Sequence, residues 1–247
     1  TKDNYFQDEF YMSTSLWKRF NQCEELGLIP FGEPTESMLI GSYVDSHVEG
    51  TLEQFKLDNP QIIAKTGKNK GKLKVGFQKA EAICNFIDQD KKIQQFLSGE
   101  KQRIMVGEIE GVPTKIMMDD YDEFAIKDLK IMQTITNRNG EYIDFISNWG
   151  YHYQGAIYRE IVRQNTGQTL PFFIVTLTKE TPINSAIIQI PDEILDTALE
   201  EVKENISRYY DIWQGKIPPE GCGKCNTCIS KRKETPLISL YDMMGGE

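Results

Sequence analysis

The chain has 247 residues, of which 39% are hydrophobic and 11% aromatic, so it is long enough for one large domain or two small ones with a sizeable core. No apolar run approaches the roughly 20 residues that a membrane-spanning helix needs. The first residues lack the basic-then-apolar layout of a signal peptide, so we expect a cytoplasmic protein without a membrane partner. The net charge of −9 argues against a polyanionic partner unless cations are concentrated locally, as they are in the lysine-rich segment 65–74.

The N-terminal third of the chain predicts helices. Ser13 is placed to cap a helix that runs to Gly27, and a second helix is expected at about 35–50. The Lys/Gly-rich stretch 65–76 predicts a solvated loop. Apolar residues at helical spacing then predict an amphipathic helix over 77–98.

The middle of the chain has strand character instead. Segment 103–131 contains three short strand-like runs, broken at 111–113 and 120–123, which predicts an antiparallel meander. After an Asn-Gly turn at 139–140 we expect a helix at 149–164, strands at 171–178 and 185–190, and a long helix at 191–214. Strands in the middle of the chain, with helices before and after them, predict an α/β protein with a central sheet flanked by helices.

A cysteine-rich tail follows this predicted domain. We expect residues 1–214 to form the domain and residues 215–247 to pack on it as an appendage. The tail holds Cys222, Cys225 and Cys228, a spacing that suits tetrahedral Zn²⁺ or an iron–sulfur cluster. A fourth ligand has to come from elsewhere in the chain, and three free thiols on a mobile tail are the alternative.

Acidic residues mark two neighbouring strands of the meander. Strand alternation puts Asp128 and Lys130 on one face of the third strand, and the preceding strand delivers Asp119 across a tight turn. Two carboxylates and an ammonium can thus meet at one site, which is the set that phosphodiester hydrolysis needs: carboxylates for divalent cations, and a lysine to position water or steady charge. Asp120 and Asp122 compete with Asp119 for this role, and a surface hairpin with solvent-exposed ion pairs is the alternative interpretation.

These acidic strands resemble a known signature. Asp119 followed by Asp128-Leu129-Lys130 is similar to the D…(D/E)-x-K pattern of the PD-(D/E)xK nuclease superfamily, although Met118 stands where many members have Pro. Four further segments resemble its RecB/RecE-like branch of phage-type exonucleases, in chain order: STSLWKRFNQCEEL at 13–26, GSYVDSHVEG at 41–50, GEIEGVPTKIMMD at 107–119 and YHYQGAIY at 151–158. The resemblance covers nearly the whole chain.

The resemblance implies a restriction-endonuclease-like core with a central mixed sheet. It implies a DNA exonuclease that depends on Mg²⁺ or Mn²⁺ and hydrolyses phosphodiester bonds from DNA ends, in phage-type recombination or repair. The catalytic residues carried over are Asp119, Asp128, Lys130, Gln154 and Tyr158. The implied metal ligands are His47, Asp119, Asp128 and the Leu129 carbonyl. Cys23 is implied as the fourth cysteine ligand, because RecB-like nucleases with a cluster draw one cysteine from the N-terminus.

DNA is the expected partner. Tyr151 is expected to contact it, together with Lys68, Lys70 and Lys72 if their loop borders the cleft. A single-strand annealing protein and further copies of the chain are possible additional partners. Two other functions stay open: a non-catalytic DNA-binding or scaffold protein that retains the fold, and a nuclease like that of CRISPR adaptation with an iron–sulfur cluster.

Overall fold

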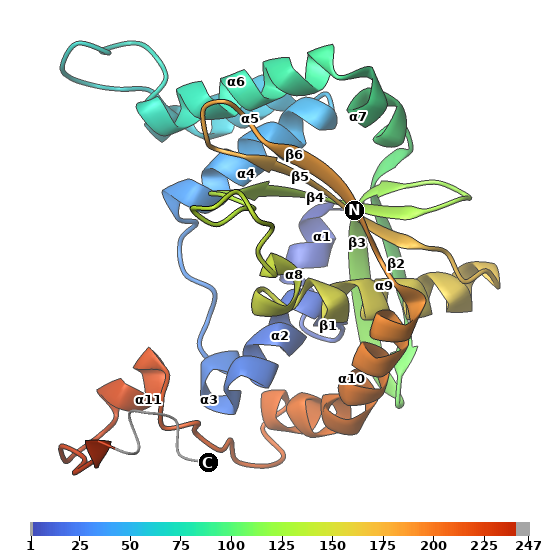
Figure 1. The fold of residues 1–247 in the computed structure, drawn as a ribbon. Coiled ribbons are helices and arrows are strands. Elements are labelled where there is room, and N and C mark those ends of the chain that lie inside the picture. Colours follow the sequence, from blue (N-terminus) through green and yellow to red (C-terminus); the bar gives the residue numbers. More distant parts are fainter. Residues whose placement is uncertain (1, 241–247) are drawn as a thin grey trace.

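A six-stranded mixed sheet lies between two groups of helices (Figure 1). The structure, a computed structural model, describes residues 2–240, so residue 1 and the last part of the predicted tail, 241–247, lie outside the described residues. The strands are β1 (Met12–Ser13), β2 (Glu100–Ile109), β3 (Val112–Tyr121), β4 (Ile126–Met132), β5 (Phe172–Thr178) and β6 (Ser185–Ile190). Among the described helices, none is both long and apolar enough to cross a membrane.

The helices fall where the sequence predicted most of them. Those with a predicted counterpart are α2 (Thr14–Gln22), α3 (Glu24–Gly27), α4 (Glu36–Val48), α6 (Val75–Gln89), α7 (Lys91–Phe96), α9 (Tyr151–Thr166) and α10 (Asp192–Trp213). Those without one are α1 (Lys2–Gln7), α5 (Leu52–Asp58), the 3₁₀ turn η1 (Pro60–Ile62), α8 (Phe145–Asn148) and α11 (Asn226–Ser230). All of the second set are short, and so they carry too little periodicity to be recognised.

Side-chain caps explain where several helices begin. The Ser13 hydroxyl accepts a hydrogen bond from the Leu16 N–H at 3.2 Å, which confirms the predicted cap of α2. The single helix predicted over 77–98 is wrong, because Asp90 divides it into α6 and α7. The Asp90 carboxylate accepts from the N–H of Lys92 at 2.9 Å and of Ile93 at 3.1 Å, so it starts a new helix at that point.

The sheet departs from a simple meander at its third strand. β2 and β3 form the long predicted hairpin. β3 then pairs with β4 at only two positions, Asp120 with Lys127 and Tyr121 with Ile126, after which the two strands diverge. β4 instead runs parallel to β5 along its whole length, and β5 is antiparallel to β6. The predicted mixed central sheet is confirmed, and the divergence of β3 and β4 opens a fork in it.

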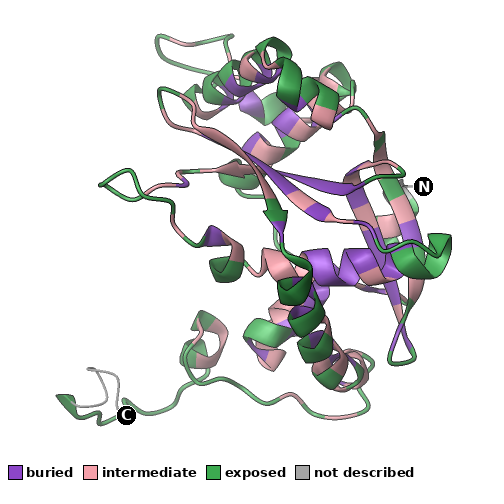
Figure 2. Cartoon of the chain, turned by 45° about the vertical axis from the view of Figure 1, so that its right-hand side comes forward, coloured by how far each residue is buried: buried purple, intermediate pink, exposed green. Residues whose placement is uncertain are grey.

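Two hydrophobic cores lie on opposite faces of this sheet. The first core packs α2, α9 and α10 on one face and includes Trp17, Phe20 and Ile126. The second core packs α4, α6 and α7 on the other face and includes Tyr43 and Leu129. The alternation of β4 assigns Ile126 to one core and Leu129 to the other. Figure 2 shows the buried residues concentrated on the strands and on the inner sides of these helices.

The chain after α10 lies against the N-terminal helices. Arg208 of α10 donates two hydrogen bonds to the Glu24 carboxylate of α3, at 2.6 and 2.9 Å. The same carboxylate accepts from the N–H of Glu220 at 2.6 Å, and Lys231 lies 3.2 Å from Glu25. These polar contacts hold the largely exposed tail beside α3, where Figure 1 shows α11.

Candidate active site and cysteine centre

The fork between β3 and β4 places two carboxylates across a narrow gap. Asp119 is the residue just before the last paired positions of β3, and Asp128 follows the first paired positions of β4. Because the strands no longer pair there, the backbone N–H of Leu129 lacks a strand partner on β3. The Asp119 carboxylate accepts from that N–H at 2.9 Å, so a side chain replaces the missing ladder bond.

Asp128 is fixed by two further side chains. It is 1% exposed, and its carboxylate forms an ion pair with the Lys130 ammonium two residues later on the same face. Gln154 of α9 donates its amide N–H to the Asp128 Oδ1 at 2.6 Å. The structure thus brings together four residues singled out from the sequence: Asp119, Asp128, Lys130 and Gln154.

The competing aspartates are engaged on the other face of the sheet. Asp120 is 0% exposed and lies 2.9 Å from the Lys127 ammonium, with Lys101 on its second oxygen. Asp122 pairs with Lys127 and accepts from the N–H of Phe124 at 2.8 Å. Strand alternation therefore leaves Asp119 as the one of the three that faces Asp128.

Asp45 of α4 is a further carboxylate at this site that the sequence did not single out. It lines the same hollow as Asp119 and Gln102. Burial and the neighbouring Asp119 carboxylate raise the pKa of Asp45 well above its ordinary value. Burial and the Asp128 carboxylate likewise raise the pKa of Asp119 to about 7. Asp45, Asp119 and Asp128 thus lie close together beside the Lys130 ammonium.

Gln102 has an unusual backbone for a residue in a strand. Its φ of 52° is in the left-handed region, which residues with a side chain adopt at a cost. The conformation directs its amide at the site, where Nε2 lies 3.4 Å from the Asp119 Oδ1. The Gln102 Oε1 is buried and has no hydrogen-bond partner among the described residues. An unpartnered oxygen beside three carboxylates indicates room for a positively charged group.

His47 is not brought to these carboxylates. Its Nε2 lies 2.8 Å from the Asp88 Oδ1, and the two residues line a neighbouring hollow. Residues two apart on an α-helix point about 200° apart, so α4 can present only one of Asp45 and His47 to the fork. The structure presents Asp45 to the fork and places His47 beside Asp88, and His47 as a metal ligand stays a prediction.

The remaining predicted residues divide between the site and the core. The Tyr151 ring lies at the site, 5.3 Å from the Lys130 Nζ, and the Leu129 carbonyl lies 3.4 Å from the same atom. Tyr158 is only 7% exposed, and its hydroxyl donates to the Met117 carbonyl at 2.8 Å. Tyr158 thereby joins α9 to β3 close to Asp128 and Asp119, and its role in catalysis stays a prediction.

The basic loop lies outside this cluster. Lys68, Lys70 and Lys72 are exposed on a hairpin-like excursion closed by the bridge between Ile63 and Leu73. Figure 1 shows this loop projecting from the end of α6. The expectation that it borders the cleft and contacts DNA stays a prediction.

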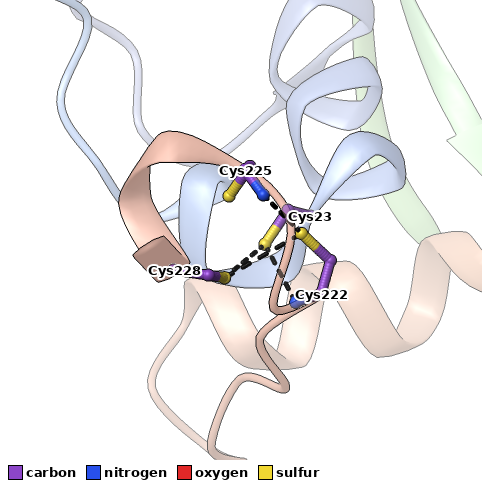
Figure 3. A group of neighbouring side chains, drawn as sticks. All are labelled: Cys23, Cys222, Cys225 and Cys228. Atoms are coloured by element: carbon purple, nitrogen blue, oxygen red, sulfur yellow. Dashed lines mark hydrogen bonds between the residues drawn. The ribbon is translucent and has the colours of Figure 1, made fainter. Parts of the chain in front are cut away.

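The four predicted cysteine ligands converge at the base of the tail. The sulfur atoms of Cys23, Cys222, Cys225 and Cys228 all lie within 4.8 Å of one another (Figure 3). The Cys222 sulfur accepts from the N–H of Lys224 at 3.4 Å and of Cys225 at 3.3 Å. These donors lower the pKa of the Cys222 thiol to about 6. The group is a four-cysteine cluster that could hold a metal, with Cys23 as its fourth member.

One cation near the fork was also missed by sequence reasoning. The Lys18 ammonium of α2 lies 4.9 Å from the Tyr151 ring centroid, on the ring that Lys130 also approaches. Burial and the nearby Lys130 ammonium lower the pKa of Lys18 to about 8. Nothing in the sequence distinguishes Lys18 from other basic residues, since its position depends on the packing of α2 against α9.

The mixed sheet, forked at two carboxylates with a lysine two residues after the second, defines the class as PD-(D/E)xK-like. Comparison with family models agrees: residues 13–231 match the PDDEXK-like domain of unknown function (DUF3799), and the chain belongs to that family. A crystal structure of a protein from Eubacterium rectale, described as a putative exonuclease, is similar at 40% sequence identity with a TM-score of 0.86. The similarity covers 100% of this chain and 98% of that one. Comparison with curated proteins gave no match.

Proposed function

We propose that this protein is a divalent-metal-dependent DNA exonuclease that hydrolyses phosphodiester bonds from DNA ends. One observation carries the proposal: on a fold of the PDDEXK-like class, the fork places Asp119 beside Asp128, and Asp128 forms an ion pair with Lys130. The Eubacterium rectale relative, described as a putative exonuclease, supports the same activity. The similarity to RecB/RecE-like phage exonucleases supports a role in recombination or repair. In that role the protein would act together with a single-strand annealing protein or as a ring of several copies of the chain.

The residues at the fork fit Mg²⁺ or Mn²⁺. Both ions prefer oxygen ligands, and Asp119, Asp128, the Leu129 carbonyl and Asp45 supply them. Burial and the neighbouring carboxylates raise the pKa values of Asp119 and Asp45, and a divalent cation at these oxygens would favour their charged forms. When bound, a divalent cation supplies charge neutralisation at the phosphate and lowers the pKa of a water.

The protein's own side chains account for positioning. Burial lowers the pKa of Lys130, but the carboxylates of Asp128 and Asp119 outweigh it and raise the pKa above its ordinary value. In the metal-free protein Lys130 therefore stays charged at neutral pH, and as an ammonium it can donate a hydrogen bond to a water or to a phosphate oxygen. Gln154 holds one oxygen of Asp128, so that the other oxygen faces Lys130.

We also propose that the cysteine centre binds a single tetrahedral ion, Zn²⁺. Four thiolates about 2.3 Å from a zinc ion lie about 3.8 Å from one another. The sulfur of Cys228 lies 3.5 Å from that of Cys23 and 3.9 Å from that of Cys222. In a four-iron cluster each thiolate binds its own iron atom, which spaces the sulfurs farther apart. The observed spacing favours zinc, and the centre joins the tail to α3 without a part in cleavage.

The test is a cleavage assay on linear and circular duplex DNA of the same sequence, with Mg²⁺, Mn²⁺ or EDTA. We expect loss of the linear DNA alone, only with metal. Asp128→Asn should abolish it, and Asp58→Asn, an exposed carboxylate on α5, is the matched control. Absence of metal-dependent cleavage by the wild type would favour a non-catalytic DNA-binding protein, and cleavage of the circle would exclude dependence on ends.

A further inference from the structure

A groove of about 610 Å³ lies beside the proposed active site. Helix α2, the segment between α3 and α4, and the turn from α8 into α9 form its walls. The exposed aromatic rings on it are Trp149, which is 61% exposed, and Phe31, also 61% exposed. Exposed aromatic side chains that line a concave surface are candidates for contact with a ligand.

The charge of this groove is opposite to that of the chain. Its lining includes the cations Lys18 and Arg19 and, among the described residues, no carboxylate. The chain as a whole carries a net charge of −9. Arg19 is held in place by the carbonyls of Leu26 at 2.9 Å and Ile29 at 2.6 Å, and its guanidinium stacks over Phe31 at 4.3 Å. A fixed positive surface in an acidic protein suits an anionic ligand.

Lys18 links the groove to the fork. Lys18 lies on the groove, and its ammonium is 4.9 Å from the Tyr151 ring. The same ring is 5.3 Å from the Lys130 ammonium, which pairs with Asp128. A phosphate chain lying along the groove would therefore reach the carboxylates after passing Lys18.

We propose that this groove binds a single strand of DNA, with an unpaired base stacked on Trp149 and a backbone phosphate at Lys18. The proposal rests on the proposed nuclease function and names the form of the substrate at that site. Aromatic rings stack on unpaired bases, whereas bases within a duplex stack on one another and leave no face for a protein ring. Cations interleaved with aromatic rings are the features by which proteins bind single strands without sequence preference.

The test measures binding without cleavage. In the Asp128→Asn background, fluorescence anisotropy gives the Kd for a labelled oligothymidylate and for a blunt duplex. Trp149→Ala should weaken binding of the single strand about ten-fold or more, whereas Trp149→Phe, which keeps a ring, should retain most of the affinity. Tyr142→Ala removes a ring that is 73% exposed outside the groove and should change nothing. Lys18→Gln should reduce the slope of log K against log salt by about 0.7.

Two results would overturn the groove assignment. Equal affinities of the Trp149→Ala and Tyr142→Ala variants for the single strand would show that the ring at Trp149 binds no base. An equal loss of affinity for the blunt duplex would show that the groove holds a duplex. The two proposals can fail separately, because the binding assay needs no cleavage. Binding through Trp149 without any cleavage by the wild type would contradict the nuclease proposal but not the groove proposal. Cleavage by the wild type without any effect of Trp149→Ala on binding would contradict only the groove proposal.

Discussion

Asp119→Asn should stabilise the metal-free protein at high pH and have little effect at low pH. Burial and the Asp128 carboxylate raise the pKa of Asp119 from its ordinary value of 3.8 to about 7. A carboxyl group with a raised pKa in the folded state favours folding while it is protonated. Its contribution is complete below pH 4 and is lost as the pH rises through about 7. Asn stays neutral at every pH and keeps an oxygen that can accept from the Leu129 N–H.

The size of the effect follows from this difference in pKa. About three pH units correspond to roughly 4 kcal/mol at 1.36 kcal/mol per unit. The Asp119 side chain is half-buried, so solvent screening reduces this to about 2 kcal/mol. For a chain of this length, that free energy corresponds to a difference in Tm of about 4–8 °C.

Thermal unfolding of both proteins in EDTA, from pH 5 to pH 8.5, measures this difference. The Tm of the variant minus that of the wild type should be about a third of its full size at pH 5, should grow up to about pH 7, and should stay constant above that, because both the folded and the unfolded wild type are then deprotonated at Asp119. Adding Mn²⁺ at pH 8.5 should raise the Tm of the wild type and leave that of the variant nearly unchanged, because the ion binds the folded carboxylates. A difference in Tm that is independent of pH, or larger at pH 5, would refute the reasoning.

Three further substitutions test the packing and the cysteine centre. Gly155→Ala would put a methyl group 2.6 Å from the Phe172 ring, so we expect a loss of about 1–3 kcal/mol in unfolding free energy despite the better helix propensity of Ala; a raised Tm would contradict this. Lys127→Ala leaves the buried Asp120 carboxylate with one fewer cation and should cost about 3 kcal/mol by urea unfolding, and a loss below 1 kcal/mol would show that Lys101 suffices. Cys222→Ser should lower the zinc content of the purified protein, measured by elemental analysis, from about one ion per chain to well below one. Iron with a visible absorption band would contradict the zinc assignment.

Periodicity and capping were enough to predict the main elements of the fold. The apolar stripes of α2, α6, α9 and α10 are long enough to be read from the sequence, as are the runs that form β5 and β6. The course of β4 could not be predicted in this way. Whether a strand continues beside β3 or leaves to pair with β5 is decided by contacts distant in sequence, which local patterns do not record.

The site was predictable as far as strand alternation reaches. The spacing of Asp128 and Lys130 places them on one face, and their ion pair follows from it. The choice between His47 and Asp45 depends on the rotation of α4 about its axis. That rotation is set by burial of Tyr43 and Val44 in the second core, and a resemblance between short segments does not fix it. The left-handed backbone of Gln102 left no sequence signal at all, since no glycine or Asn-Gly pair marks it.

Side chains from the layers of both hydrophobic cores come together at the fork in the sheet. Asp45 is carried by a helix of the second core, Gln154 by a helix of the first, and the strands between them carry Asp119 and Asp128. Neither layer alone holds the full set of groups that we propose for catalysis. The proposed cleavage activity would consequently report partial unfolding, since loosening either layer separates these groups while most of the secondary structure is still intact.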